Sequence, residues 1–206
     1  SILSHHSVSN EKRHDSRYTM SPDQSTVLVV DDEQDVADLY AMWLQDDYRV
    51  LSAYEGDEAL DVLDDTVDVV LLDRRMPGQS GDEVLEVIRE RDLNCRVVMV
   101  TAVKPDFDIL EMGFDDYLVK PVSKDELHEV VEQMLTRVDY GSQLQDYYSL
   151  VSKKAVLEAE KDPEELQAND EYADLEAEID ELGAEVDDTR DQLDDHDDFV
   201  GAFQDL

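Results

Sequence analysis

The chain has 206 residues, of which 55 are acidic and 17 are basic, so its formal net charge is −38 at pH 7. Because the acidic residues are spread along the whole chain, we interpret them as a solvated surface like that of halophile proteins, suited to a salt-rich cytoplasm. The alternative is an acidic protein that binds basic partners. Direct nucleic-acid binding is disfavoured, because no Lys/Arg cluster exists beyond residues 11–14.

The composition also bears on location. A single cysteine, Cys95, excludes an internal disulfide framework and fits a reducing compartment. No apolar run reaches the length of a membrane span, and no signal-peptide core is present. We therefore expect a cytoplasmic protein without a membrane partner. Residues 1–24 are polar and lack periodicity, which predicts a disordered tail, and Met20 leaves open whether residues 1–19 belong to the natural protein.

From residue 25 to residue 137, strand patterns alternate with helix patterns. We expect strands at 27–30, 49–53, 67–72, 97–101 and 116–120, and helices near 36–44, 59–63, 81–88, 105–112 and 123–134. This alternation predicts right-handed crossovers and a parallel sheet that is covered on both faces. The predicted fold class is therefore α/β, a doubly wound five-stranded sheet with the strand order 2-1-3-4-5.

Four of the predicted strands end in a polar residue. Asp31 and Asp32 follow the first strand, and Asp73 follows the third, a continuous apolar run. The fourth strand ends at Thr101 and the fifth at Lys120. Each residue alone has an ordinary explanation, as a turn cap, a buried β-branched residue or a surface lysine. Because the carboxyl ends of parallel strands share one edge of the sheet, we expect all five to meet there.

The chemistry of this set points to phosphoryl transfer. Three carboxylates repel each other strongly unless a cation joins them, and hard oxygens suit Mg²⁺, which commonly works with phosphate. Lys120 can pair with a phosphoryl oxygen, and Thr101 can donate a hydroxyl hydrogen bond. A carboxylate such as Asp73, held between metal and lysine, can attack phosphorus and form an aspartyl phosphate.

The motifs at these strand ends resemble the receiver domain of two-component response regulators. They are Asp31-Asp32, Asp73 with Met76-Pro77, Thr101-Ala102 and Tyr117-Leu118-Val119-Lys120-Pro121. The resemblance covers residues 25–137 and implies a flavodoxin-like fold. It also implies a phospho-accepting switch that catalyses only its own phosphorylation and dephosphorylation. An independent phosphatase would use similar carboxylates, but the chain lacks an added substrate-binding domain.

The resemblance also implies a role for each site residue. Asp73 would take a phosphoryl group from the histidine of a sensor kinase. Asp32 and Asp73 would bind Mg²⁺ directly, Asp31 would act through water, and the backbone carbonyl of Arg75 would be a further ligand. A cis peptide bond would follow Lys120 and aim its side chain inward.

The switch that the resemblance implies involves Thr101 and Tyr117. When phosphate arrives, the threonine hydroxyl would move towards it and the aromatic ring would fill the vacated space. The segment 105–112 has a thin apolar face, so we expect it to shift. Arg75 has two interpretations: it leans over the phosphoryl group and slows attack by water, or it forms a salt bridge with surface acids.

Residues 138–206 form a separate acidic segment. We expect one helix at 140–160, a break at Asp162-Pro163, and then a coiled-coil seam at Tyr172, Leu175, Ile179, Leu182, Val186, Thr189 and Leu193. Such a stripe must fold back on the preceding helix or pair with a second chain. A homodimer would form through this tail or through the receiver segment. The segment resembles HalX, a small helical output domain found after receiver domains in haloarchaea.

Two functions remain open. In the first, phosphorylation controls a switch whose helical tail binds an unidentified protein or dimerises. In the second, the tail of a transcriptional regulator contacts DNA or the basal transcription machinery. The few basic residues of the tail favour the first.

Overall fold

The computed structural model describes residues 24–137 and 142–201, with side chains described over 24–136 and 143–187. Almost all of the predicted N-terminal tail lies outside these residues. None of the helices in the described part of the chain is both long and apolar enough to cross a lipid bilayer.

The first half of the chain folds around a parallel sheet of five strands in the order β2-β1-β3-β4-β5. The strands are β1 (Thr26–Val30), β2 (Arg49–Ala53), β3 (Val69–Leu72), β4 (Arg96–Thr101) and β5 (Asp116–Val119). This order confirms the predicted topology. β1 and β3 lie inside the sheet and are buried along their whole length, which explains why both are continuous apolar runs.

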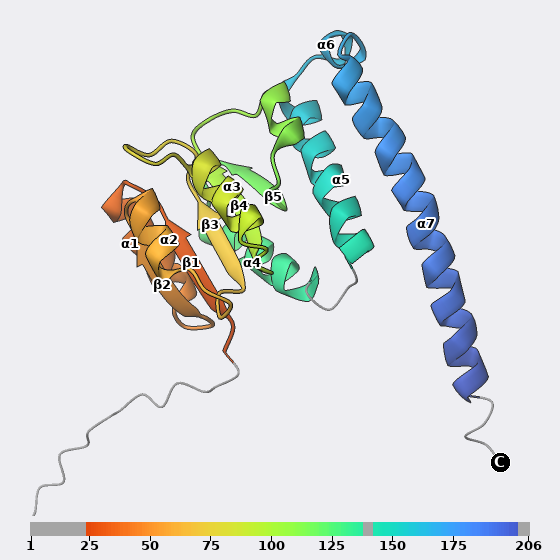
Figure 1. Ribbon diagram of the computed structural model, residues 1–206, viewed down its shortest axis with the longest axis horizontal. Helices are drawn as coiled ribbons and strands as arrows, with labels where there is room; N and C mark the ends of the chain where they lie inside the picture. The colour runs from red at the N-terminus through yellow and green to blue at the C-terminus, as the bar shows by residue number, and fades with distance from the viewer. Residues whose placement is uncertain (1–23, 138–141, 202–206) are drawn as a thin grey trace, which may run out of the picture.

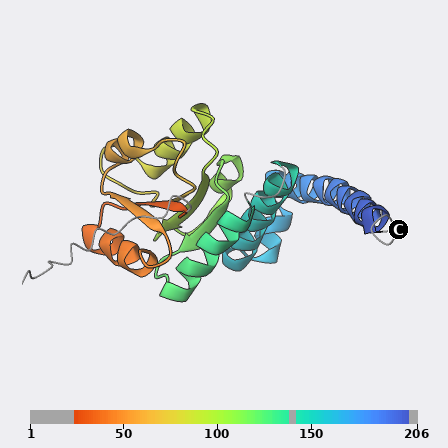
Figure 2. The same cartoon turned by 90° about the horizontal axis from the view of Figure 1, so that it is seen from below.

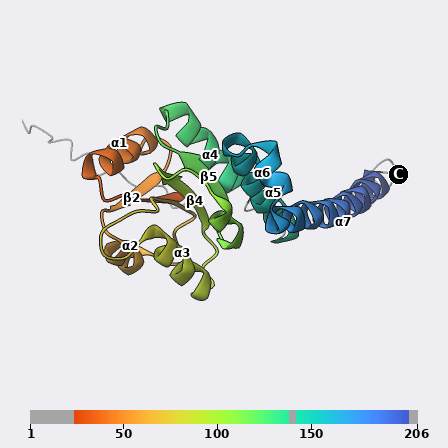
Figure 3. The same cartoon turned by 90° about the horizontal axis from the view of Figure 1, so that it is seen from above.

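Helices cover both faces of the sheet, as Figure 3 shows. One face carries α1 (Gln34–Leu44) and α4 (Lys124–Arg137), and the other carries α2 (Gly56–Val62), α3 (Gly81–Glu90) and the 3-10 helix η1 (Phe107–Glu111). Successive β1 side chains point to opposite faces, so Val27 and Val29 pack in one core while Leu28 and Val30 pack in the other.

The predicted helix at 105–112 is corrected to a single short 3-10 segment. Its hydrogen bonds span three residues, from Ile109 N to the Asp106 carbonyl and from Met112 N to the Ile109 carbonyl. The Asp106 side chain accepts a bond from the first amide, and Ile109 is the only buried residue of the five in η1. Ile109 alone is fully buried, while Phe107 and Leu110 pack only partly against the core, so the segment lacks the periodic buried stripe that stabilises an α-helix.

The second half of the chain is helical, with α5 (Ser142–Glu160), α6 (Pro163–Gln167) and α7 (Asp170–Gly201). Pro163 opens α6, as the sequence predicted, and the Asp162 amide just before it donates to Glu165 Oε2 at 3.2 Å. α7 packs against α5 of the same chain, and Figures 1 and 2 show it projecting away from the sheet. Tyr172 and Leu175 are buried, so the first part of the predicted seam closes within one chain.

The remaining seam residues divide into two groups. Ile179, Leu182 and Val186 are half-buried. The side chains of Thr189 and Leu193 lie outside the described residues, so pairing of that part with a second chain stays a prediction.

Gly81, the first residue of α3, packs directly against the backbone that follows β3, so it sets how closely the helix approaches the end of the strand. A Cβ atom at this position would lie 2.0 Å from the Asp73 carbonyl oxygen. We expect Gly81→Ala to lower the free energy of unfolding by about 3 kcal/mol, because the backbone must move to relieve the overlap. Chemical denaturation at constant molar KCl measures this effect.

Gly183→Ala is the matched control, since the nearest atom to its Cβ is a Tyr147 ring carbon at 3.3 Å. Alanine inside a helix is favoured over glycine by about 1 kcal/mol, so this variant should keep or gain stability. Equal losses in the two variants would contradict the prediction.

Candidate functional site

Three carboxylates meet at the carboxyl edge of the sheet. Asp31 follows β1 and Asp73 follows β3, and both are buried. One oxygen from each of Asp31, Asp32 and Asp73 lies within 4.8 Å of the others. The parallel register of β1 and β3, which pairs Val30 with Leu72, delivers both strand ends to the same level. The structure therefore brings together the acidic residues that the sequence predicted to meet.

Lys120 reaches into this carboxylate cluster from the end of β5. Its Nζ lies 2.5 Å from Asp31 Oδ2 and 3.5 Å from Asp73 Oδ2. The Lys120 amide donates to the Thr101 carbonyl at 2.8 Å, which ties the ends of β4 and β5 together. The peptide bond between Lys120 and Pro121 is cis, as the resemblance implied.

Burial and neighbouring charges have opposite effects on the pKa values of Asp31 and Lys120. Burial raises the pKa of Asp31, and the hydrogen bond from Lys120 opposes this shift without cancelling it. Burial alone would lower the pKa of Lys120, but the hydrogen bond to Asp31 and the charge of Asp73 outweigh it, so that the pKa is raised. Lys120 therefore stays protonated far above neutral pH, and its charge is available to an anion.

The carboxylate cluster fits a divalent cation. Three carboxylates and one ammonium leave two negative charges, and the cluster offers only oxygen ligands. Asp31 Oδ1 also accepts the Glu33 amide at 3.0 Å, which orients its carboxylate. A hard ion such as Mg²⁺, which keeps several of its waters, suits this donor set. The role of the Arg75 carbonyl stays a prediction.

The predicted switch residues are both buried and meet at one loop residue. Thr101 Oγ1 accepts a hydrogen bond from the Val103 amide at 3.2 Å. Tyr117 OH donates to the Val103 carbonyl at 2.6 Å. Tyr117 is only 2% exposed. The loop after β4 is thus bonded to both residues, although their movement stays a prediction.

Sequence reasoning missed Arg74 and emphasised its neighbour Arg75. The Arg74 guanidinium is buried and binds Asp82 through two bonds of 3.0 and 2.9 Å, and Asp108 at 2.5 Å. Burial would lower the pKa of Arg74, but these hydrogen bonds reverse the shift and raise it. The sequence did contain a signal for this role. Arg74 directly follows Asp73, and Asp82, an acidic residue in the first turn of α3, lies eight residues after Arg74.

Arg75 itself is exposed. Its amide donates to Asp73 Oδ1 at 3.4 Å. Its guanidinium forms no ion pair with any acidic residue in the described ranges. The interpretation as a surface salt bridge therefore has no support in this part of the chain, and an effect on the lifetime of a phosphoryl group stays a prediction.

Comparison with known proteins finds two family matches. Residues 27–132 match the response regulator receiver domain, and residues 136–203 match the HalX domain. A Haloferax volcanii protein named putative transcriptional regulator is 55% identical over 152 residues, which are 71% of this chain and 26% of the relative. The Escherichia coli transcriptional regulatory protein CpxR is 36% identical over 124 residues, 58% of this chain and 53% of the relative. The chain thus spans between a quarter and about half of the length of these relatives.

A solved structure with the same fold is the BeF3-activated receiver domain of DrrB, a protein of Thermotoga maritima. It is 30% identical, with a TM-score of 0.52, and the match covers 55% of this chain and 99% of that one.

Mg²⁺ should stabilise the folded chain by binding the carboxylate cluster. At about ten times its dissociation constant, a ligand of the native state alone adds about 1.4 kcal/mol to the free energy of unfolding. We therefore expect a higher melting temperature in MgCl2 at constant ionic strength. The Asp32→Asn variant should lose this increase, whereas Asp57→Asn, an exposed carboxylate on α2, should retain it. Equal responses from both variants would place the stabilising ion elsewhere.

Proposed function

The chain belongs to the response regulators, with a receiver domain followed by a HalX domain, and from this premise we propose that Asp73 accepts a phosphoryl group from a sensor histidine kinase. Phosphorylation then switches the contacts of the helical segment 138–206, which follows the receiver segment 25–137. We place this exchange in the cytoplasm. The observation that carries the proposal is the position of Asp73, buried in the carboxylate cluster with Lys120 Nζ 3.5 Å from its Oδ2.

The proposed reaction uses groups at this edge of the sheet. An oxygen of Asp73 forms a bond to phosphorus while the phosphorus–nitrogen bond of the phosphohistidine breaks, and the electron pair of that bond remains on the imidazole. Lys120 stabilises the negative charge on a phosphoryl oxygen, and the Thr101 hydroxyl donates to another. A bound Mg²⁺ would add positive charge beside the transferring group, held by Asp32 and Asp73 directly and by Asp31 through water, with the Arg75 carbonyl as a further ligand.

A relative supports this proposal. The DrrB receiver domain has been obtained in a BeF3-activated form. The receiver segment of this chain, residues 27–132, includes Asp73 and Lys120, and the geometry around both suits an anion of the same kind.

Intact mass measurement tests the acceptor. We expect the full chain, incubated with acetyl phosphate and Mg²⁺ at molar KCl, to gain the mass of one phosphoryl group. Asp73→Asn should gain none, because an amide oxygen cannot form the acyl phosphate. Asp57→Asn is the control and should be modified like the natural chain. A mass gain that survives in Asp73→Asn would overturn the assignment.

The second candidate function is transcriptional regulation, favoured by the names of the Haloferax volcanii and Escherichia coli relatives. In it, the HalX helices contact DNA or the transcription machinery. The described part of α7 is acidic along its exposed face, which favours a protein partner or a second copy of the chain over the phosphate backbone.

Duplex DNA binding and oligomer size, measured at molar KCl with and without acetyl phosphate, separate the two outputs. For the proposed protein-binding output we expect no duplex binding, because the acidic helices offer few cations to pair with the phosphate backbone, and a change in oligomer size on phosphorylation. Asp73→Asn is the control and should show no change in size. Duplex binding that requires acetyl phosphate would establish the second function instead.

A further inference from the structure

A cavity of about 530 Å³, which we call the junction cavity, lies between the receiver segment and the HalX helices. Its receiver side is formed by the last turn of α3, the first residue of β4 and the residues just before β5. Its other side is formed by α5 and α7. Because the strands are parallel, this is the amino edge of the sheet, opposite the carboxylate cluster. Pockets for small organic ligands commonly measure about 300–1,000 Å³, so the junction cavity is large enough for one.

The charged residues of the junction cavity differ from those of the chain as a whole. The chain has 55 acidic and 17 basic residues, whereas the cavity is lined by equal numbers of the two kinds. The basic residues are Arg89, Arg96 and Lys153, and the acidic residues are Asp115, Asp146 and Glu178. Cations are therefore enriched on these walls.

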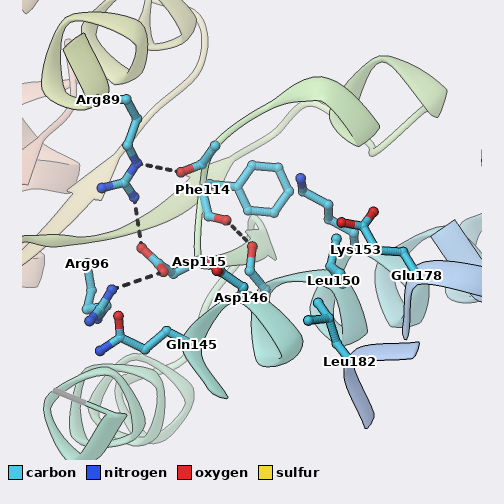
Figure 4. Close-up of a pocket in the computed structure, with 12 residues that line it drawn as sticks. Arg89, Arg96, Phe114, Asp115, Gln145, Asp146, Leu150, Lys153, Glu178 and Leu182 are labelled. Carbon is cyan, nitrogen blue, oxygen red and sulfur yellow. Dashed lines mark hydrogen bonds and ion pairs between the residues drawn. The ribbon is translucent and has the colours of Figure 1, made fainter. Parts of the chain in front are cut away.

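Of the three acidic residues, all in the described part of the chain, only Asp115 forms ion pairs with these cations. Asp115 is buried, and its carboxylate lies 3.0 Å from Arg89 Nη2 and 3.6 Å from Arg96 Nη1, as Figure 4 shows. Asp146 and Glu178 are exposed to solvent, and the screening length in molar salt is only about 3 Å. The two arginines therefore share one carboxylate, which leaves one positive charge in excess.

A second positive charge in excess belongs to Lys153. The residue is only 6% exposed, and no acidic residue in the described ranges forms an ion pair with it. Its Nζ donates to the Leu110 carbonyl at 3.1 Å and lies 5.5 Å from the centre of the Phe114 ring, towards which it points in Figure 4. Burial lowers the pKa of Lys153, and the charges of Glu178 and Asp115 do not cancel this shift. A buried charge is normally paired, so this ammonium is suited to an additional anion.

Arg96 has hydrogen-bonding capacity that the described part of the chain does not use. Its Nε is buried and has no hydrogen-bond partner there, and its ion pair with Asp115 is longer than a hydrogen bond. Buried polar groups are usually satisfied. A guanidinium with incompletely satisfied donors is suited to bind an oxyanion.

The remaining walls of the junction cavity are partly apolar. Phe114 lines it from the receiver, Leu150 from α5 and Leu182 from α7. A ligand that matches this lining has an apolar body as well as a negative charge. An inorganic ion alone would leave these apolar side chains without a partner.

We propose that the junction cavity binds a small organic anion that carries an oxyanion group, such as a carboxylate, on an apolar body. The three cations hold the oxyanion, and the apolar body packs against Phe114 and the two leucines. Because the walls come from both segments, the ligand contacts the receiver and the HalX helices at once. The site is separate from Asp73, and the inference does not rest on the proposed function.

Benzoate and benzamide test this proposal, because they share a phenyl ring and differ in charge. Each is titrated into the full, isotope-labelled chain at constant molar KCl, and backbone amide chemical shifts are followed by NMR. We expect benzoate to shift the amides of residues 113–115 and 145–153, with a dissociation constant in the millimolar range for so small a ligand. Benzamide should bind at least about tenfold more weakly, because it cannot pair with the cations.

Three variants locate the binding. Leu150→Trp fills the junction cavity and should abolish benzoate binding, whereas the control Ala155→Trp adds the same side chain at an exposed position of α5 and should bind like the natural chain. Lys153→Met removes the charge but keeps an apolar stem of similar length. It should bind benzoate about fivefold more weakly and leave benzamide binding unchanged. Thermal denaturation verifies that each variant is folded.

Equal affinity for benzoate and benzamide would overturn the preference for an anion. Absence of benzoate shifts in the natural chain, or shifts confined to the surroundings of Asp73, would overturn the junction cavity as the site. Benzoate binding that survives in Leu150→Trp would overturn it as well. If Leu150→Trp does not fold, Lys153→Met decides, and unchanged benzoate affinity in that variant contradicts the proposal.

Discussion

The structure depends on holding three carboxylates together at one edge of a sheet. Asp31, Asp32 and Asp73 repel each other, and Lys120 offsets this by lying between two of them. A parallel sheet makes the arrangement possible, because all strand ends that carry these residues emerge on the same side. The apolar strands behind them supply the stability that the cluster itself does not.

The scarcity of basic residues gives each buried cation a clear structural role. Lys120 joins β5 to the carboxylate cluster, Arg74 joins the end of β3 to α3 and η1, and Lys153 joins the HalX helices to the receiver. All three are buried or nearly so, where salt screens little. At high ionic strength, exposed acids on the surface keep the chain hydrated while these inner contacts define its architecture.

The contacts of residues 102–108 connect the chemistry to the helices. This segment is bonded to Thr101 and Tyr117 on one side and to Glu160 of α5 on the other. An element with weak internal stability and strong contacts to two sites is well suited to transmit a change between them. The long helix α7 extends the HalX domain away from this junction, where a partner can reach it.

Local pattern by itself determined the strands, most of the helices and the identity of the acidic site residues. Apolar runs ending in Asp31, Asp73 and Lys120 imply a common edge, because side chains at the ends of parallel strands must converge. Only the tertiary structure showed that η1 is a short 3-10 segment and that Arg74, rather than Arg75, forms the buried ion pair with Asp108. It also showed that Lys153 binds the Leu110 carbonyl of the receiver. The bonds from Arg74 to Asp108 and from Lys153 to the Leu110 carbonyl join residues 34 and 43 positions apart, and periodicity along a chain contains no information about such distant neighbours.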